Sequence, residues 1–171
     1  MYEFRPQRTN NRAQNLIILL FVGAAALFGL TFLLEDFPYL WAIQLLAMLL
    51  VVAAIFLVTR YLMKAYEYAV IPSEGGADLT VTEVSAGGKR RITVCRISLS
   101  GIESVTVVEG SDERIRARRR AGKIYDYRPD VSPDRSLMAV AKEGGEELCI
   151  LFAYGEEFLR ILETYTNGRN I

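Results

Sequence analysis

The sequence contains no histidine, and this absence excludes several kinds of chemistry. Without histidine the chain cannot form a Ser-His-Asp or Cys-His catalytic arrangement, a histidine-ligated metal site or a histidine pH switch. A P-loop and a dinucleotide-binding fingerprint are also missing, because the glycine pairs stand between expected strands and not before helices. We therefore expect a non-enzymatic protein that has no cofactor and no metal.

Cysteine is scarce and net charge is absent. The two cysteines, Cys95 and Cys149, each fall within an expected strand, and we interpret them as buried structural thiols. The 20 Lys and Arg residues balance the 20 Asp and Glu residues, so the net charge is zero. This balance argues against a nucleic-acid-binding protein, which needs an excess of basic residues.

Apolar residues, by contrast, are concentrated near the N-terminus. Leu16–Leu34 has no ionisable side chain, and Leu40–Val58 has Gln44 as its only strongly polar residue. A helix of either length is roughly 28 Å long, close to the hydrocarbon thickness of a bilayer. The sequence predicts an N-terminal segment at 1–15 and a transmembrane hairpin at 16–62, with spans at about 16–34 and 40–60. A cleaved signal peptide and a pair of buried core helices are the alternatives, but the apolar run is long and a second run follows it.

Basic residues near the ends of the spans predict the orientation of the hairpin. They precede the first span and follow the second, whereas the connecting segment 35–39 has none: Arg5, Arg8, Arg12, Arg60 and Lys64. Because positive residues favour the cytoplasmic side, we expect a multi-pass inner-membrane protein. Its N-terminal segment and its C-terminal domain would both be cytoplasmic.

Two features of the spans bear on helix packing. Ala25 and Gly29 form a pair of small residues that could allow close helix contact, although they could equally be ordinary helix residues. We expect the Gln44 side chain to hydrogen-bond to the partner helix or to a second copy of the chain.

After the hairpin the pattern changes to short alternating segments separated by glycine pairs. We predict about seven strands, four before the polar segment Gly110–Gly122 and three after it. A C-terminal helix then begins near Gly155 and presents an apolar stripe of Phe158, Ile161, Leu162 and Tyr165. The fold class is therefore a membrane α hairpin plus an α+β, mainly-β soluble domain.

Three stretches carry a resemblance to a known family: Tyr66–Val70 directly after the second span, Arg96–Val105, and Phe152–Gly155 before the helix. With them the chain resembles bacterial membrane proteins that combine a two-helix transmembrane hairpin with a bacterial PH-like domain. The resemblance implies, at 66–168, a PH-like barrel of about seven antiparallel strands closed by a C-terminal helix. It supplies no catalytic residue. The alternative is a membrane-anchored OB-like barrel that acts as an accessory or scaffold subunit, but an OB barrel needs only about five strands.

Basic residues form the strongest local signal in the soluble part. They fall in two clusters: Lys89, Arg90 and Arg91, and then Arg114, Arg116, Arg118, Arg119, Arg120 and Lys123. These residues could form a solvated connector, contact anionic lipid headgroups, or contact an acidic partner. Nucleic acid is the least favoured ligand, because no aromatic residues alternate with the arginines.

Together these patterns predict a non-enzymatic PH-like module held in the lipid bilayer. It would bind a protein or peptide partner, or anionic lipid headgroups, at the cytoplasmic membrane face. A homo-oligomer is a further expected assembly.

Overall fold

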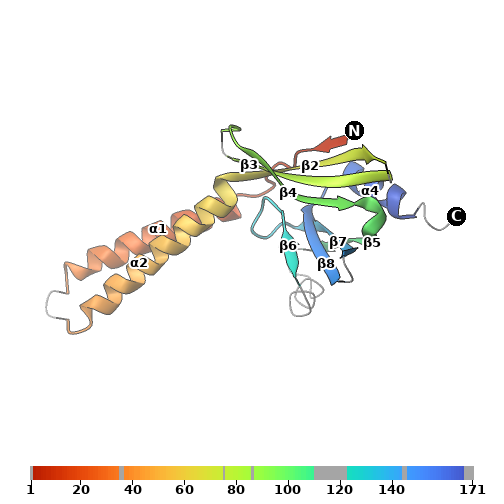
Figure 1. Cartoon of the computed structure of the whole chain (residues 1–171). Coiled ribbons are helices and arrows are strands. Elements are labelled where there is room, and N and C mark those ends of the chain that lie inside the picture. Colours follow the sequence, from red (N-terminus) through yellow and green to blue (C-terminus); the bar gives the residue numbers. More distant parts are fainter. Residues whose placement is uncertain are drawn as a thin grey trace. The chain divides into compact units, whose positions relative to one another are not determined.

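The computed structural model describes residues 2–34, 37–74, 76–85, 87–109, 123–143 and 146–167. The chain divides into two compact units, shown in Figure 1. We call Asn10–Lys64 the helical unit, and Met1–Thr9 together with Ala65–Ile171 the β unit. The residues before the first helix therefore fold with the β unit, a placement that the sequence pattern did not indicate.

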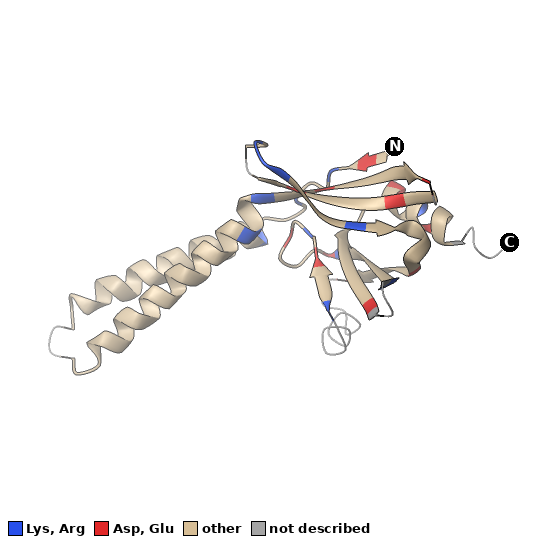
Figure 2. Ribbon diagram, in the orientation of Figure 1, with Lys and Arg blue, Asp and Glu red and all other residues tan. Residues whose placement is uncertain are grey.

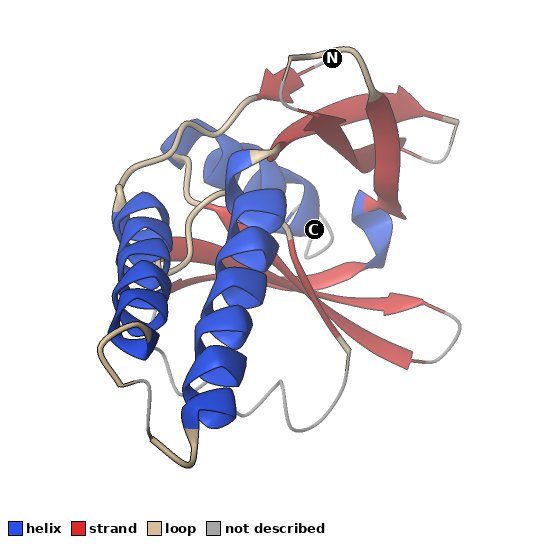
Figure 3. Cartoon of the chain, turned by 90° about the vertical axis from the view of Figure 1, so that its left-hand side faces the viewer, coloured by secondary structure: helices blue, strands red, loops and turns tan. Residues whose placement is uncertain are grey.

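The helical unit is a pair of antiparallel helices, seen side by side in Figures 1 and 3. Helix α1 is Arg12–Thr31, and α2 is Leu40–Leu57, which continues into the π-helical turn η1 at Val58–Leu62. Both helices are long and apolar enough to cross a membrane. In the most apolar 18-residue stretch of each, only 17% and 11% are buried. Core helices of a soluble protein would be mostly buried, so these helices are candidate membrane spans.

Alanine side chains form much of the contact between α1 and α2. Ala24, Ala47 and Ala54 are at most 4% exposed, whereas large residues such as Leu33 and Trp41 are 81% and 65% exposed. This pattern is opposite to that of a water-soluble helix pair and suits helices whose outer faces meet lipid.

Neither the Ala25–Gly29 pair nor Gln44 takes part in the contact between α1 and α2. Ala25 and Gly29 are exposed, and a Cβ added at Gly29 would meet no atom within 4 Å, so Ala24 makes the close contact in their place. One residue along a helix changes the direction of a side chain by about 100°, which explains the difference. Gln44 is also exposed, and within the described residues its side chain forms no hydrogen bond to α1. Of the two partners expected for Gln44, the partner helix is therefore wrong, and a second copy of the chain stays a prediction.

The first sheet of the β unit has the strand order β1-β2-β3-β4. Its strands are β1 (Tyr2–Phe4), β2 (Lys64–Ser73), β3 (Gly76–Ser85) and β4 (Arg91–Ser98). Strand β1 pairs antiparallel with β2 and places Phe4 opposite Tyr68. The two strands that flank the helical unit in the chain are therefore neighbours in one sheet.

The second sheet has the order β5-β7-β8-β6. Its strands are β5 (Ile102–Glu109), β6 (Ile124–Asp126), β7 (Arg135–Glu143) and β8 (Glu146–Ala153). Strands β5, β7 and β8 are antiparallel, but β6 runs parallel to β8. Two reversals of chain direction, into β7 and then into β8, give β6 and β8 the same direction.

The predicted strands and the C-terminal helix are present, but their arrangement differs from the prediction in four ways. The described residues contain eight strands, because β1 is added to those predicted, and β6 is not antiparallel. The sheets part at the 3-10 turn η2 (Leu99–Gly101) and not at Gly110–Gly122, so that β5 belongs to the second sheet. The described residues form two four-stranded sheets and not a closed barrel.

The change of sheet at η2 has a packing cause. Leu99 is 1% exposed and Ile102 is 2% exposed, so side chains on both sides of the turn are buried in the same core. Burying two such side chains contributes a few kcal/mol, about 1.5–3 each. The turn is thereby fixed as a corner between the two sheets.

Helix α4 (Glu156–Asn167) packs Phe158 and Leu162 into the core. The rings of Tyr68, Phe152 and Phe158 meet with centroid distances of 5.3–5.8 Å, and all three are fully buried. The predicted apolar stripe is only partly buried, because Tyr165 is 45% exposed. Thus β2, β8 and α4 share one aromatic core.

Candidate functional site

The β unit contains a cleft of about 650 Å³ between the segment after β1 and the loop that joins β6 to β7. Phe4, the last residue of β1, and Thr9 line one side of the cleft. Arg128 and Asp130 line it from the loop, and Tyr154, which follows β8, also lines it. Two of these lining residues, Arg128 and Asp130, are charged and buried, at 5% and 4% exposure. Buried charges need partners, so their contacts decide what the cleft can do.

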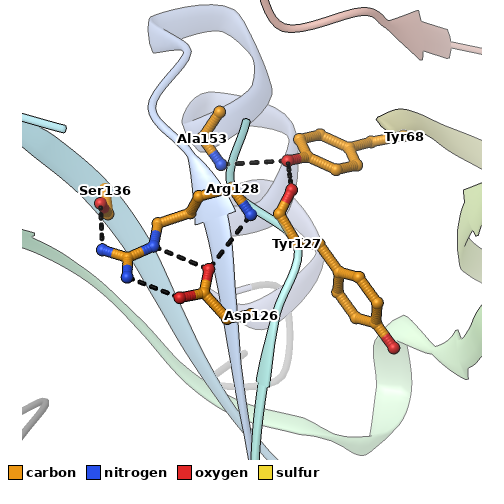
Figure 4. Close-up of polar contacts among 6 residues, drawn as sticks. All are labelled: Tyr68, Asp126, Tyr127, Arg128, Ser136 and Ala153. Carbon is orange, nitrogen blue, oxygen red and sulfur yellow. Dashed lines mark hydrogen bonds and ion pairs between the residues drawn. The ribbon is translucent and has the colours of Figure 1, made fainter. Parts of the chain in front are cut away.

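The guanidinium of Arg128 is held on three sides, as Figure 4 shows. Its Nε donates to Asp126 Oδ1 at 2.8 Å and its Nη2 donates to Asp126 Oδ2 at 2.6 Å. Its Nη1 donates to the Ser136 hydroxyl at 3.2 Å. This two-pronged pairing is the strong geometry for arginine with a carboxylate. Arg128 therefore links β6 to β7 and has a structural role in the lining of the cleft.

Tyr68 connects the first sheet to the second beside this pair (Figure 4). Its hydroxyl donates to the Tyr127 carbonyl oxygen at 2.8 Å and accepts from the Ala153 N–H at 3.2 Å. Burial raises the pKa of the Tyr68 hydroxyl well above its ordinary range. The neutral hydroxyl is thus the form that the folded domain holds.

Asp130 fixes the segment between β1 and α1. Its Oδ2 accepts hydrogen bonds from the Thr9 N–H at 3.0 Å and from the Thr9 hydroxyl at 2.7 Å. Nearer the start of this segment, the Phe4 ring stacks on Phe158 with centroids 5.6 Å apart. The segment is therefore attached to the β unit at both ends.

The rim of the cleft carries charges of both signs. Arg5 forms an ion pair with Glu67, and the Arg135 guanidinium lies 5.8 Å from the centroid of the Tyr154 ring. Asp134, which is exposed, adds a carboxylate. The rim therefore has no excess of positive charge among these residues.

A second, smaller hollow of about 230 Å³ lies between β4 and the strands β6 and β8. Val94 and Cys95 line it from β4, and Tyr125, Tyr127 and Ile150 line it from the second sheet. Tyr125 is 42% exposed and Val94 is 39% exposed. Burial, and then the contact with Cys95, raises the pKa of Tyr127. The outer strands of the two sheets, β4 and β6, thus leave between them a hollow lined by both apolar and polar side chains, Arg96 among them.

Metal-ligating side chains are not grouped at either hollow, as far as the described residues show. Across the described residues, no group of three or more His, Cys, Asp or Glu side chains is placed to hold a metal ion. Cys149 is buried and Cys95 is half-buried, and they belong to different sheets.

Comparison with protein families adds an identification to this geometry. A family model described as "Bacterial PH-like domain (DUF6106)" matches residues 6–170. The chain belongs to this family. The match includes both apolar helices, strands β2 to β8 and α4, and it begins after β1. No curated protein and no solved structure matches the chain.

Membership in the PH-like family confirms the resemblance found in the sequence and decides against the OB-like fold. The PH-like domain here is a pair of sheets with α4 packed into their core. Its family description carries a fold and no activity.

The structure brings some of the predicted basic residues of the PH-like domain together. Lys89 and Arg90 are exposed in the β3–β4 turn, and their side chains form no hydrogen bond or ion pair with the described residues. Arg91 begins β4, and its Nη2 lies 3.4 Å from Glu67 Oε1. Gly87 and Gly88 precede them with φ of +101° and +71°, values that favour glycine and define the tight turn.

The second basic cluster is only partly described. Lys123 stands directly before β6, and its carbonyl oxygen accepts from the Cys149 N–H at 3.4 Å. Arg114, Arg116, Arg118, Arg119 and Arg120 lie outside the described residues. The β3–β4 turn and the start of β6 are well apart in Figure 2, so Lys123 does not join the first cluster.

Sequence reasoning missed the residues that build the cleft. The stretch Asp126-Tyr127-Arg128-Pro129-Asp130 matches no functional motif, so its charges carry no role in the sequence analysis. The signal available was an acidic and a basic residue two positions apart before a proline. Nothing in the sequence indicated that Thr9 would meet Asp130.

Proposed function

We propose that the protein is a non-enzymatic module that anchors a PH-like domain to the cytoplasmic face of the inner membrane, where the domain binds anionic lipid headgroups. One observation carries the anchoring. Strands β1 and β2 flank the two apolar helices in the chain and are paired in one sheet. If both helices span the bilayer, both ends of the hairpin lie on the same side, together with the whole domain.

The charge distribution supports the cytoplasmic side. Five basic residues stand near these two ends of the hairpin, whereas the connecting segment 35–39 has Glu35 and Asp36 and no basic residue. Positive residues near the ends of spans favour the cytoplasm. The domain would then face the leaflet rich in anionic lipids.

The turn between β3 and β4 supports headgroup binding. Lys89 and Arg90 are exposed without a partner among the described residues, and Arg91 has only a long contact to Glu67. Each basic side chain near an anionic leaflet contributes about 1 kcal/mol of electrostatic attraction to the membrane surface. The chain is already tethered by its helices, so such contacts would orient the domain and not recruit it.

Cysteine labelling of the full chain in cells tests the anchoring. An impermeant maleimide should label Tyr39→Cys, in the connecting segment, from outside intact cells. It should label Lys89→Cys, in the exposed β3–β4 turn, only after the membrane is made permeable. Labelling of Lys89→Cys in intact cells would overturn the proposed orientation.

Hydrogen exchange of the full chain in nanodiscs tests the headgroup contact. Residues 87–91 should exchange more slowly in discs with phosphatidylglycerol than in discs of phosphatidylcholine alone. The variant with Lys89→Gln, Arg90→Gln and Arg91→Gln should lose this difference. Equal exchange of the wild-type turn in both lipids would overturn headgroup binding there.

A second candidate function, binding of an extended peptide, is favoured by the hollow between β4 and β6. Val94 and Tyr125 expose apolar surface there, and an outer strand can pair with an added strand. Affinity capture of the full chain from mild detergent, with mass spectrometry, would identify such a partner. Val94→Lys should release it, whereas Val107→Lys, on the similarly exposed Val107 of β5, should retain it.

A further inference from the structure

Gln44 is a polar residue in an apolar setting. It lies one turn into α2, about 6 Å from the start of the helix at Leu40. Its side chain is exposed and forms no hydrogen bond with any described residue. A glutamine amide has two N–H donors and one acceptor oxygen. Hydrocarbon offers no partner for any of them, so an unpaired amide there is costly.

The Gln44 side chain lines a groove of about 680 Å³ on the helical unit. The small residues Ala24, Ala25 and Ala47 line the same groove, and Phe28 and Met48 supply larger apolar surface. Small side chains let a second helix approach closely, which is how helices associate in membranes. The groove thus combines close apolar contact with one unsatisfied hydrogen-bonding group.

We propose that a second copy of this chain occupies the groove, with the two Gln44 amides hydrogen-bonded to each other. This inference rests on the proposed membrane anchorage. Two copies inserted by the same rules have the same orientation, so a closed dimer has its two-fold axis along the membrane normal. That axis places both Gln44 residues at the same depth. Each amide oxygen can then accept from the N–H₂ of the other, which pairs two groups that hydrocarbon leaves unpaired.

A lipid chain fits the groove less well than a second helical unit. It would fill the apolar part of the groove but would leave the Gln44 amide without a partner. The exposed Ala25, which lines the groove, also gains a role as a contact between copies. The pairing therefore accounts for the amide and for the small residues together.

The first test measures dimerisation of the full chain in lipid vesicles by energy transfer between labelled copies. Gln44→Leu should weaken association on the order of tenfold, the effect of losing two interhelical hydrogen bonds. Gln44→Asn keeps the amide and should lose less. The matched control is Gln14→Leu, the same change at an exposed position of α1 outside the groove, and it should associate like the wild type.

The second test uses disulfide cross-linking in vesicles with an added oxidant, in a chain that carries Cys95→Ala and Cys149→Ala. Met48→Cys, in the groove, should cross-link to its copy. Leu49→Cys should not, although Leu49 is similarly exposed, at 56% against 62% for Met48. Equal cross-linking at both positions would overturn the proposed face.

Extraction at alkaline pH separates this proposal from the anchorage. A chain that stays in the bilayer but is monomeric, or whose Gln44→Leu variant associates like the wild type, overturns the dimer alone. A chain that alkali removes from the bilayer overturns the anchorage, and the dimer with it.

Discussion

The Thr9 hydroxyl donates to Asp130 Oδ2 at 2.7 Å, although the two residues are 121 positions apart in sequence. The Thr9 N–H donates to the same oxygen at 3.0 Å. Asp130 is nearly fully buried, so these contacts replace hydrogen bonds that its carboxylate would otherwise make with water. Thr9 is the last residue of the β unit before the helical unit begins. The pair thus attaches the chain to the β unit at the residue where the chain passes into the helical unit.

We expect Asp130→Ala to lower the free energy of unfolding by about 2 kcal/mol, because two hydrogen bonds to a carboxylate are lost. Thr9→Ala should cost less, since the backbone donor remains. Urea unfolding of the full chain in detergent, followed by circular dichroism, measures both. Asp134→Ala, an exposed carboxylate in the same loop, should change stability by about 0.5 kcal/mol or less. Equal losses at Asp130 and Asp134 would contradict the assigned role of Asp130.

Replacing Arg128 should be more damaging. Arg128→Met takes the buried guanidinium away from the half-buried Asp126, and losing such charged hydrogen bonds costs about 2–3 kcal/mol. Arg160→Met is the matched control, because Arg160 and Glu156 also form an ion pair, at 2.7 Å, but both side chains are at least 70% exposed. Its cost should stay below about 1 kcal/mol. The same unfolding experiment compares the two variants, and a similar loss in both would show that burial of the Arg128 pair is unimportant.

Gly155 tests how closely β1 is packed. A Cβ added there would lie 2.7 Å from Phe4 Cζ, whereas a Cβ at Gly101 would lie 3.6 Å from its nearest neighbour. Gly155→Ala should therefore destabilise the domain by about 1–3 kcal/mol and increase hydrogen exchange in β1. Gly101→Ala should leave β1 unchanged. Adding Phe4→Leu to Gly155→Ala should recover part of the lost stability. If stability does not recover, the clash is not with Phe4.

Stability should fall in alkaline solution because of the buried tyrosines. The folded domain raises the pKa of Tyr68 and of Tyr127 above the ordinary value of 10.0. A raised pKa favours the neutral form, so the contribution to stability is complete below about pH 10 and is lost as pH rises above it. Tyr68→Phe should flatten this pH dependence while lowering stability at neutral pH, because its two hydrogen bonds disappear. Unfolding curves between pH 7 and pH 11 measure the effect, and an unchanged slope in Tyr68→Phe would contradict it.

Periodicity predicted the individual elements of this fold well, because each is short and locally encoded. Tyr66, Tyr68 and Val70 alternate with half-exposed residues and lie in β2, and Phe158 and Leu162 recur at helical spacing in α4. The pairing of strands was harder to predict. Strand β5 belongs to the second sheet because Leu99 and Ile102 are both buried at a corner, and alternation along one strand carries no information about its neighbour.

The candidate site was less predictable than the fold. The cleft depends on long-range pairs, such as Thr9 with Asp130, whose members have no recognisable pattern around them. The exposed basic turn at Lys89 and Arg90 was found from sequence because a charge cluster beside a glycine pair is a local signal. Strand β1 was missed because three residues, Tyr2–Phe4, are too few to show alternation.

The pairing of Phe4 with Tyr68 also has a consequence for biogenesis. The ribosome makes β1 first, then both apolar helices, and only afterwards the strand that pairs with β1. The first sheet therefore cannot be completed until both helices have been synthesised and have left the ribosome. If the helices integrate into a membrane as proposed, chain segments made before and after that step meet in one sheet, and completion of the sheet then depends on integration.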